Sequence, residues 1–143
     1  MSDSIALSSE LRRLVEARIE QTVRGVEDTL NRIQEAHAIT PKELKADLKS
    51  LEESFNILSQ KWSLEILYIL FLTKGAARFN ELKRVLEVNS RTLSDKLRTL
   101  QDNGYIERNV NPDPPLRVEY TLSDKGRNTV LLALPLLYYS RSM

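Results

Sequence analysis

The segment Phe79–Gly104, which reads FNELKRVLEVNSRTLSDKLRTLQDNG, gives the clearest indication of the fold of this chain of 143 residues. A short linker, Ala76–Arg78, precedes it. Its first eight residues predict a helix of about two turns, because apolar side chains recur there at helical spacing. The side chains expected to face inward are Phe79, Leu82, Val85 and Leu86. Val88 and Asn89 then predict a turn, so that a second helix follows almost at once.

The second helix is expected to run from Arg91 to Asn103, with Ser90 as its N-cap. Gly104 takes the C′ position that ends it. At 100° per residue, Leu97 and Leu100 both fall within about 40° of Leu93, so that three leucines predict one buried face. The pattern of the whole stretch is helix, tight turn, helix.

The flanking segments complete a small domain. Trp62–Thr73 (WSLEILYILFLT) is apolar on nearly every face, which is typical of a central buried helix, and Gly75 is expected to end it. Beyond the second helix the apolar period changes to two, so that Tyr105–Val110 and Leu116–Leu122 predict a β-hairpin. Asn111–Pro115 between these strands predicts a loop, which three prolines stiffen.

A helix-turn-helix followed by a hairpin is the winged form of a DNA-reading fold, in which the second helix enters the major groove. Opposite its leucines that helix carries charged and hydroxyl side chains. Arginine presents a planar fork to the two acceptors of a guanine edge, and hydroxyl groups bind either bases or phosphates. We expect DNA contacts from Ser90, Arg91, Thr92, Ser94, Asp95 and Arg98. The alternative is that Arg91–Asp95 and Asp95–Arg98 are only surface ion pairs at helical spacing.

The hairpin and the first helix offer further side chains for DNA. Those of the hairpin suit phosphate contact or an arginine in the minor groove, and a polar loop without a partner is the alternative. They are Arg108, Asn109, Asn111 and Arg117. Lys83 and Arg84 on the first helix, with Arg78 before it, would lie near backbone phosphates in this docking mode. For each of these three, a solvated charge is an equal alternative.

The N-terminal part predicts a long amphipathic helix over Ser9–His37. Its apolar residues step by four and three, as in a narrow coiled-coil seam. They are Leu11, Val15, Ile19, Val23, Val26, Leu30 and Ile33. Such a helix, roughly 40 Å long at 1.5 Å per residue, overhangs a domain of this size. This indicates a dimerisation arm, or else a helix folded back on its own domain.

A second helix of the arm is expected to restart at Thr40 and to run to about Ser59. Thr40 is its N-cap, Pro41 takes the first helical position and Glu43 closes a capping box. Its stripe again steps by four and three, through Leu44, Leu48, Leu51, Phe55 and Leu58. Both helices of the arm therefore bury only one stripe.

At the other end, Ser123 is expected to cap a terminal helix that reaches about Leu137. Its apolar residues cover every face, which water tolerates only if a partner surface covers them. They are Val130, Leu131, Leu132, Leu134, Leu136, Leu137, Tyr138 and Tyr139. A second copy of the chain is one such surface, and the chain's own N-terminal helices are another.

The sequence thus predicts a mainly α protein with a small β-hairpin. Residues 1–60 form an N-terminal arm of two helices for dimerisation or scaffolding, and residues 61–122 form a winged helix-turn-helix domain that binds DNA. Residues 123–143 form a C-terminal helix at the dimer interface.

Six blocks in this order resemble the HxlR-type winged-helix transcription regulators, which are related to MarR. The blocks are Lys61–Leu67, Arg78–Leu82, Ser90–Ser94, Leu97–Leu100, Gly104–Arg108 and Pro115–Leu122. The resemblance covers about residues 58–130 and implies a homodimer that binds operator DNA, more often as a repressor than as an activator. It places Ser90–Arg98 in the recognition helix and Asn111–Arg117 in the wing. Many members sense through an N-terminal cysteine; this chain has none, so the inducing signal is not implied.

Composition excludes other classes of protein. The absence of cysteine excludes a disulfide scaffold, a thiolate zinc site, a cysteine nucleophile and a thiol redox switch. With a single histidine, His37, and no nucleotide-binding or nucleophile motif, the sequence predicts neither an enzyme nor a cofactor or metal site. No apolar run approaches the ~18–20 residues of a membrane span, and the N-terminus lacks a secretion signal. We therefore expect a cytoplasmic protein without a membrane partner.

Charge favours double-stranded DNA as the partner of the C-terminal part. Residues 1–60 hold 8 basic and 11 acidic side chains, whereas residues 61–143 hold 13 and 9. Because this excess is small, a winged-helix module that binds protein, or a protein that coats DNA without sequence preference, is the alternative function. For a dimer we expect a pseudo-palindromic operator with recognition helices roughly 34 Å apart. A small apolar effector between arm and core is compatible with the sequence, which identifies no residue for it.

Overall fold

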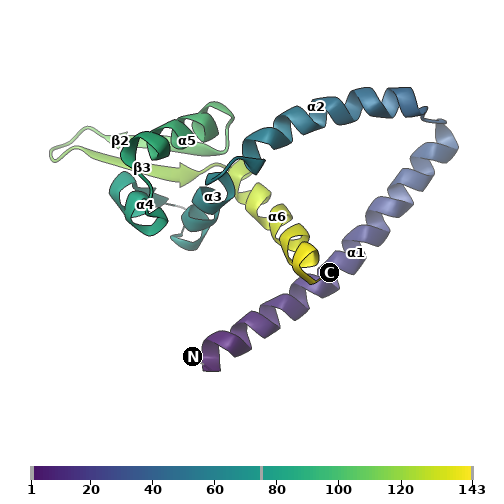
Figure 1. Ribbon diagram of the computed structural model, residues 1–143, viewed down its shortest axis with the longest axis horizontal. Helices are drawn as coiled ribbons and strands as arrows, with labels where there is room; N and C mark the ends of the chain where they lie inside the picture. Colours follow the sequence, from purple (N-terminus) through teal and green to yellow (C-terminus); the bar gives the residue numbers. More distant parts are fainter. Residues whose placement is uncertain (1, 75, 143) are drawn as a thin grey trace. The chain divides into compact units, whose positions relative to one another are not determined.

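The computed structural model describes residues 2–74 and 76–142. Gly75, predicted to end the central helix, lies outside the described residues. The elements are mainly helical with one small antiparallel sheet, as predicted (Figure 1). In order they are α1 Ser2–Ala36, α2 Pro41–Ser59, α3 Ser63–Leu72, β1 Ala76–Arg78, α4 Phe79–Leu86, α5 Ser90–Asp102, β2 Ile106–Asn111, β3 Arg117–Leu122 and α6 Asp124–Ser142.

The chain forms two compact parts. One comprises residues 50–130 and holds the helix-turn-helix and the sheet; the other comprises the residues up to 49 together with those from 131 onward. The predicted functional division at residues 60 and 122 stays a prediction. Among the described helices, none is both long enough and apolar enough to span a membrane.

The sheet has three strands in the order β1-β3-β2, all antiparallel. The predicted hairpin is β2–β3, with Ile106 opposite Leu122 and Asn111 opposite Arg117. The third strand, β1, was expected to be only a linker, because three residues are too few to show a period of two. Ala77 of β1 faces Tyr120 of β3, and both side chains are buried.

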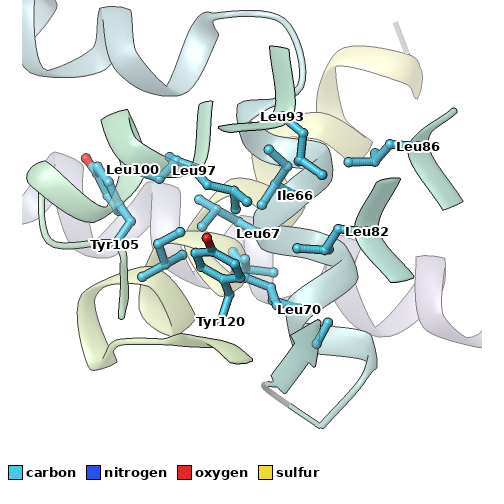
Figure 2. Packing of buried hydrophobic residues seen from close by; sticks show 13 residues of the cluster. Ile66, Leu67, Leu70, Leu82, Leu86, Leu93, Leu97, Leu100, Tyr105 and Tyr120 are labelled. Atoms are coloured by element: carbon cyan, nitrogen blue, oxygen red, sulfur yellow. The ribbon is translucent and has the colours of Figure 1, made fainter. Parts of the chain in front are cut away.

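The core of residues 50–130 is built around α3. Ile66, Leu67 and Leu70 of this helix are completely buried. Figure 2 shows Leu93 and Leu97 of α5 on the side of the core where Ile66 and Leu67 lie, and Leu100 is equally buried. The predicted buried face of α5 is therefore confirmed.

The predicted inner face of α4 was wrong at one residue. Leu82 and Leu86 are buried and Phe79 packs against the core, but Val85 is 60% exposed. At 100° per residue, Val85 lies about 90° away from the centre of the other three side chains. In a helix of only eight residues this offset places Val85 beside the core instead of in it.

The junction between α5, β2 and α6 is tightly fastened. Gly104 has a φ of 81°, the left-handed conformation typical of the C′ position predicted for it, and its carbonyl accepts a hydrogen bond from the Ser123 hydroxyl at 2.5 Å. The same hydroxyl oxygen accepts from the backbone N–H of Gly126 at 3.0 Å, which confirms Ser123 as the cap of α6. Lys125 donates to the Asn103 carbonyl at 2.9 Å, and its Nζ lies 4.4 Å from the centroid of the Tyr105 ring.

In the other part, the capping box of α2 is confirmed. The backbone N–H of Thr40 donates to Glu43 Oε2 at 3.4 Å, and the N–H of Glu43 donates to Thr40 Oγ1 at 3.3 Å. α6 continues through Pro135 to Ser142, five residues beyond its predicted end. Most residues of the apolar stripes of α1 and α2 are exposed, as are Leu132 and Leu136 of α6, whereas Val15, Ile19 and Leu58 are half-buried.

Two glycines give a matched test of the junction. A Cβ at Gly126 would overlap the carbonyl oxygen of Tyr105, whereas one at Gly25 meets nothing within 4 Å. We expect Gly126→Ala to lower the free energy of unfolding by about 1–3 kcal/mol through overpacking. Gly25→Ala should not measurably lower the free energy of unfolding, since alanine has a higher helix propensity than glycine. Urea unfolding followed by circular dichroism measures both, and equal stability of the two variants would refute the packing described here.

Candidate nucleic-acid interface

The turn of the helix-turn-helix is closed by Asn89. Its side-chain Oδ1 accepts the backbone N–H of Thr92 at 2.8 Å, and its carbonyl accepts the N–H of Leu93 at 3.1 Å. Asn89 is therefore the N-cap, and Ser90, predicted in that role, is the first helical residue. Asparagine and serine are both good caps, so their adjacency in the sequence left the position ambiguous by one residue.

The predicted reading face of α5 is turned to solvent. Arg91, Ser94, Asp95 and Arg98 are exposed, as is Ser90 at the start of the helix, and Thr92 is half-buried. In the part of the chain that the structure describes, both ion pairs lie in α1, between Arg12 and Glu16 and between Arg24 and Glu20. The alternative interpretation, in which the arginines of α5 are held by Asp95, therefore has no support from the geometry.

One hydrogen bond that the sequence did not predict anchors α5. Lys96 Nζ donates to Gln60 Oε1 at 3.0 Å and joins the helix to the segment between α2 and α3. Trp62, at the end of this segment, has a φ of 78°, an unusual conformation for a residue with a Cβ. The two partners are 36 residues apart, so no local pattern indicates the bond.

The charged residues of α4 and β1 are also exposed. Lys83 and Arg84 occupy the last turn of α4, where the helix dipole favours cations. Arg78 ends β1 and lies opposite Glu119 of β3. A role in phosphate contact and a role as solvated charges are both compatible with this placement.

The β2–β3 hairpin is the wing, and the residues predicted to contact DNA lie on both of its faces. Asn109, Asn111 and Arg117 share the outer face, because residues opposite each other or two apart on a strand point the same way. Arg108 lies opposite Tyr120, on the other face of the hairpin. The side chain of Tyr120 is buried in the core, whereas that of Arg108 is exposed. Figure 1 shows the β2–β3 hairpin extending beyond the helices of its own part of the chain.

The two asparagines of the wing have partners inside the hairpin. Asn109 Nδ2 donates to Thr121 Oγ1 at 2.9 Å, across the two strands. Asn111 Oδ1 accepts the backbone N–H of Asp113 at 3.1 Å and so closes the start of the loop. These bonds give both residues a structural role in the wing, which leaves Arg108 and Arg117 as its main candidates for DNA contact.

No metal site is apparent: among the residues that the structure describes, no three side chains of the types His, Asp and Glu gather as ligands. The fold and the site together define a winged helix-turn-helix protein whose second helix, α5, exposes the predicted reading face. Residues 57–137 match the family described as HxlR-like helix-turn-helix. This match spans more than half of the chain, which therefore belongs to the HxlR-like family of helix-turn-helix transcriptional regulators.

Relatives agree with this assignment. YvaP of Bacillus subtilis (strain 168), named an uncharacterized HTH-type transcriptional regulator, is 38% identical over 77 residues, 53% of this chain and 69% of YvaP. A structure assigned to MarR-family regulators, from Enterococcus faecalis V583, matches with a TM-score of 0.62 and 28% identity over 74% of this chain and 91% of that one. The redox regulator HypR in its reduced form matches with a TM-score of 0.57 and 29% identity, over 65% and 91%.

The assignment of the cap can be tested by replacing each candidate. Asn89→Ala removes the acceptor of the Thr92 N–H and should lower the free energy of unfolding by about 1 kcal/mol. Ser90→Ala removes no such bond, so the free energy of unfolding should fall by less than half of the loss in Asn89→Ala. The measurement is the midpoint of urea unfolding at constant slope. The reverse order of the two losses would move the cap to Ser90.

Proposed function

We propose that this protein is a homodimeric, sequence-specific DNA-binding regulator that reads a pseudo-palindromic operator. The observation that carries the proposal is the two-sided build of α5, since three leucines fix one side in the core and leave arginine and hydroxyl groups exposed on the other. Such a helix suits insertion into the major groove, which admits one helix and displays a distinct pattern for each base pair.

Base reading falls to the exposed side chains of α5. Arg91 and Arg98 supply forks for guanine O6 and N7, and Asp95 supplies an acceptor for the amino group of cytosine. Ser90, Thr92 and Ser94 lie in the first turns of the helix, where they contact bases or the adjoining phosphates. The neighbouring Thr99 is half-buried, and its hydroxyl donates to the Asp95 carbonyl at 3.0 Å.

Phosphate contacts come from the surrounding basic residues. Lys83 and Arg84 of α4 bind one side of the groove, while Arg108 and Arg117 of the wing bind the neighbouring backbone or minor groove. The internal bonds of Asn109 and Asn111 stiffen the wing that carries these two arginines. DNA affinity in this scheme depends strongly on salt concentration.

Regulation follows from dimerisation and operator binding. The arm and the C-terminal helix supply the dimer interface, and two recognition helices enter successive major grooves roughly 34 Å apart. Repression follows when such a dimer occupies a promoter, as the family resemblance implies. HypR is called a redox regulator, but this chain has no cysteine, so a redox signal through its own thiols is not part of the proposal.

The decisive experiment is selection of duplexes from a random pool by the purified protein, followed by sequencing. We expect a two-fold-symmetric site, which the double variant Arg91→Ala/Arg98→Ala fails to enrich. On the selected site, Arg98→Ala alone should weaken the free energy of DNA binding by about 1–3 kcal/mol, and by less on unrelated DNA. Arg127→Ala, an exposed arginine of α6 outside the reading face, is the matched control. An equal loss on all sequences would make Arg98 a phosphate contact.

A salt titration tests the wing separately. Each phosphate neutralised contributes about 0.9 to the slope of log K against log salt concentration. Arg117→Ala should therefore reduce the slope by about 1 and weaken binding to every sequence alike. The slope of Arg127→Ala should equal that of the parent protein. A slope unchanged in Arg117→Ala would remove the wing residue from the interface.

A module that binds another protein through the same surface is the second candidate function. The acidic residues Asp95, Asp102, Glu107 and Glu119 on the exposed faces of α5 and the wing favour it. It predicts that no duplex is enriched even at low salt. The same outcome with tight binding to all duplexes would indicate DNA coating without sequence preference.

A further inference from the structure

The N-terminal helix carries an apolar seam that the family match does not include. The match begins at residue 57, whereas α1 ends at Ala36. Over the second half of α1, apolar residues alternate at spacings of four and three, which is the heptad pattern of a coiled coil. They are Ile19, Val23, Val26, Leu30 and Ile33. In the heptad notation abcdefg, Val23 and Leu30 occupy position a. The other three apolar residues, Ile19, Val26 and Ile33, occupy position d.

The surface of α1 is hollowed along this seam. One hollow is lined by Val23, Val26, Glu27 and Leu30, with Thr22 and Asn31 at its ends. These four residues stand at i, i+3, i+4 and i+7, the set that forms the hole for one knob of a facing helix. The Val26 side chain at its centre is 54% exposed. The seam thus has the surface relief of one half of a coiled coil.

A second hollow continues the apolar surface from α1 to α6. It is lined by Ile19, Thr22 and Val23 of α1 and by Leu132, Pro135, Leu136 and Tyr139 of α6. The lining of this hollow is mostly apolar, and the hydroxyl of Thr22 donates a hydrogen bond to the Arg18 carbonyl at 2.9 Å. Leu132 beside it is 75% exposed. This continuous apolar surface suits contact with an apolar surface of a partner.

We propose that a second copy of this chain covers the seam, as a parallel coiled coil of the two α1 helices. This proposal rests on the dimeric regulator proposed above and assigns its interface to a segment outside the family match. The seam is self-complementary, because the heptad pattern of one copy supplies both the knobs and the holes for the other. In the parallel arrangement Val26 of each copy enters the hole described above, which contains the same residue of its partner.

The flanking charges select the parallel orientation. The e positions beside the seam carry Glu20 and Glu27, and the g positions carry Thr22 and Thr29. In a parallel pair each e position faces a g position, so that Glu27 lies beside a threonine of the other copy. In an antiparallel pair e positions face each other and bring carboxylates together, which is unfavourable. The chain therefore avoids repulsion only in the parallel form.

Cysteine cross-linking tests both the seam and its orientation in the full chain. Because the chain has no cysteine, one introduced thiol reports on one position alone. Ile19→Cys and Ile33→Cys should each form a disulfide-linked dimer under mild oxidation, since equivalent d positions of a parallel pair lie within the reach of a disulfide. Gln21→Cys, on the opposite side of the same helix, is the matched control and should stay unlinked.

A charge variant supplies a second readout. Val26→Glu places two carboxylates in the seam and should shift the protein from dimer to monomer in sedimentation at micromolar concentration, while Gln21→Glu stays dimeric. Circular dichroism of both variants checks that the helices persist. Linkage only in a mixture of Ile19→Cys and Leu30→Cys, a d position and an a position that face each other in an antiparallel pair, would overturn the parallel arrangement. A dimer that tolerates Val26→Glu and links at neither position would overturn the seam.

These readouts use no DNA, so they separate the two proposals. If the seam fails while duplex selection still yields a two-fold-symmetric site, the regulator stands and its interface lies elsewhere. If the thiols link as expected while no duplex is enriched, the coiled coil stands and the proposed function fails.

Discussion

The need to cover the apolar helix α3 organises the domain of residues 50–130. α3 has almost no polar face, and Ile66, Leu67 and Leu70 contact no water. A helix of this kind is stable only when several elements surround it. The sheet, α4 and the leucines of α5 cover α3. Because these leucines must face the core, the orientation of α5 about its own axis is fixed. The exposed arginine and hydroxyl face follows from that orientation.

Holding α5 in place takes more than its three leucines. Asn89 satisfies an N–H group at the start of the helix, Gly104 turns the chain at its end, and Lys96 joins it to Gln60. None of these bonds uses a side chain of the reading face. The helix is therefore fixed by groups on its ends and flank, which leaves Arg91 and Arg98 available to a partner. Preorganisation of this kind lowers the entropy cost of binding.

The sequence predicted the elements well and the details of side-chain pairing less well. Periodicity located α3, α4, α5 and the hairpin, because each buries one or more faces in a regular pattern. It missed β1, whose pairing with β3 depends on residues more than forty positions later. It also counted Val85 as core and took Ser90 for the cap, since neither the edge of a short apolar stripe nor the choice between adjacent capping residues is encoded locally. The internal bonds of Asn109 and Asn111 depend on the strand register and the loop, and no sequence pattern shows them.

Charge is distributed unevenly along the sequence, between the proposed arm of residues 1–60 and the residues that follow it. Acidic residues predominate in residues 1–60 and basic residues in residues 61–143. Because phosphates repel an arm with an excess of acidic residues, this distribution supports the proposal that the helix-turn-helix, and not the arm, faces DNA. The two proposed interactions also differ in their forces: salt weakens phosphate contact steeply, whereas apolar burial along a seam is insensitive to screening. Raising the salt concentration should therefore release DNA from a dimer that stays intact, which keeps assembly and operator release independent of each other.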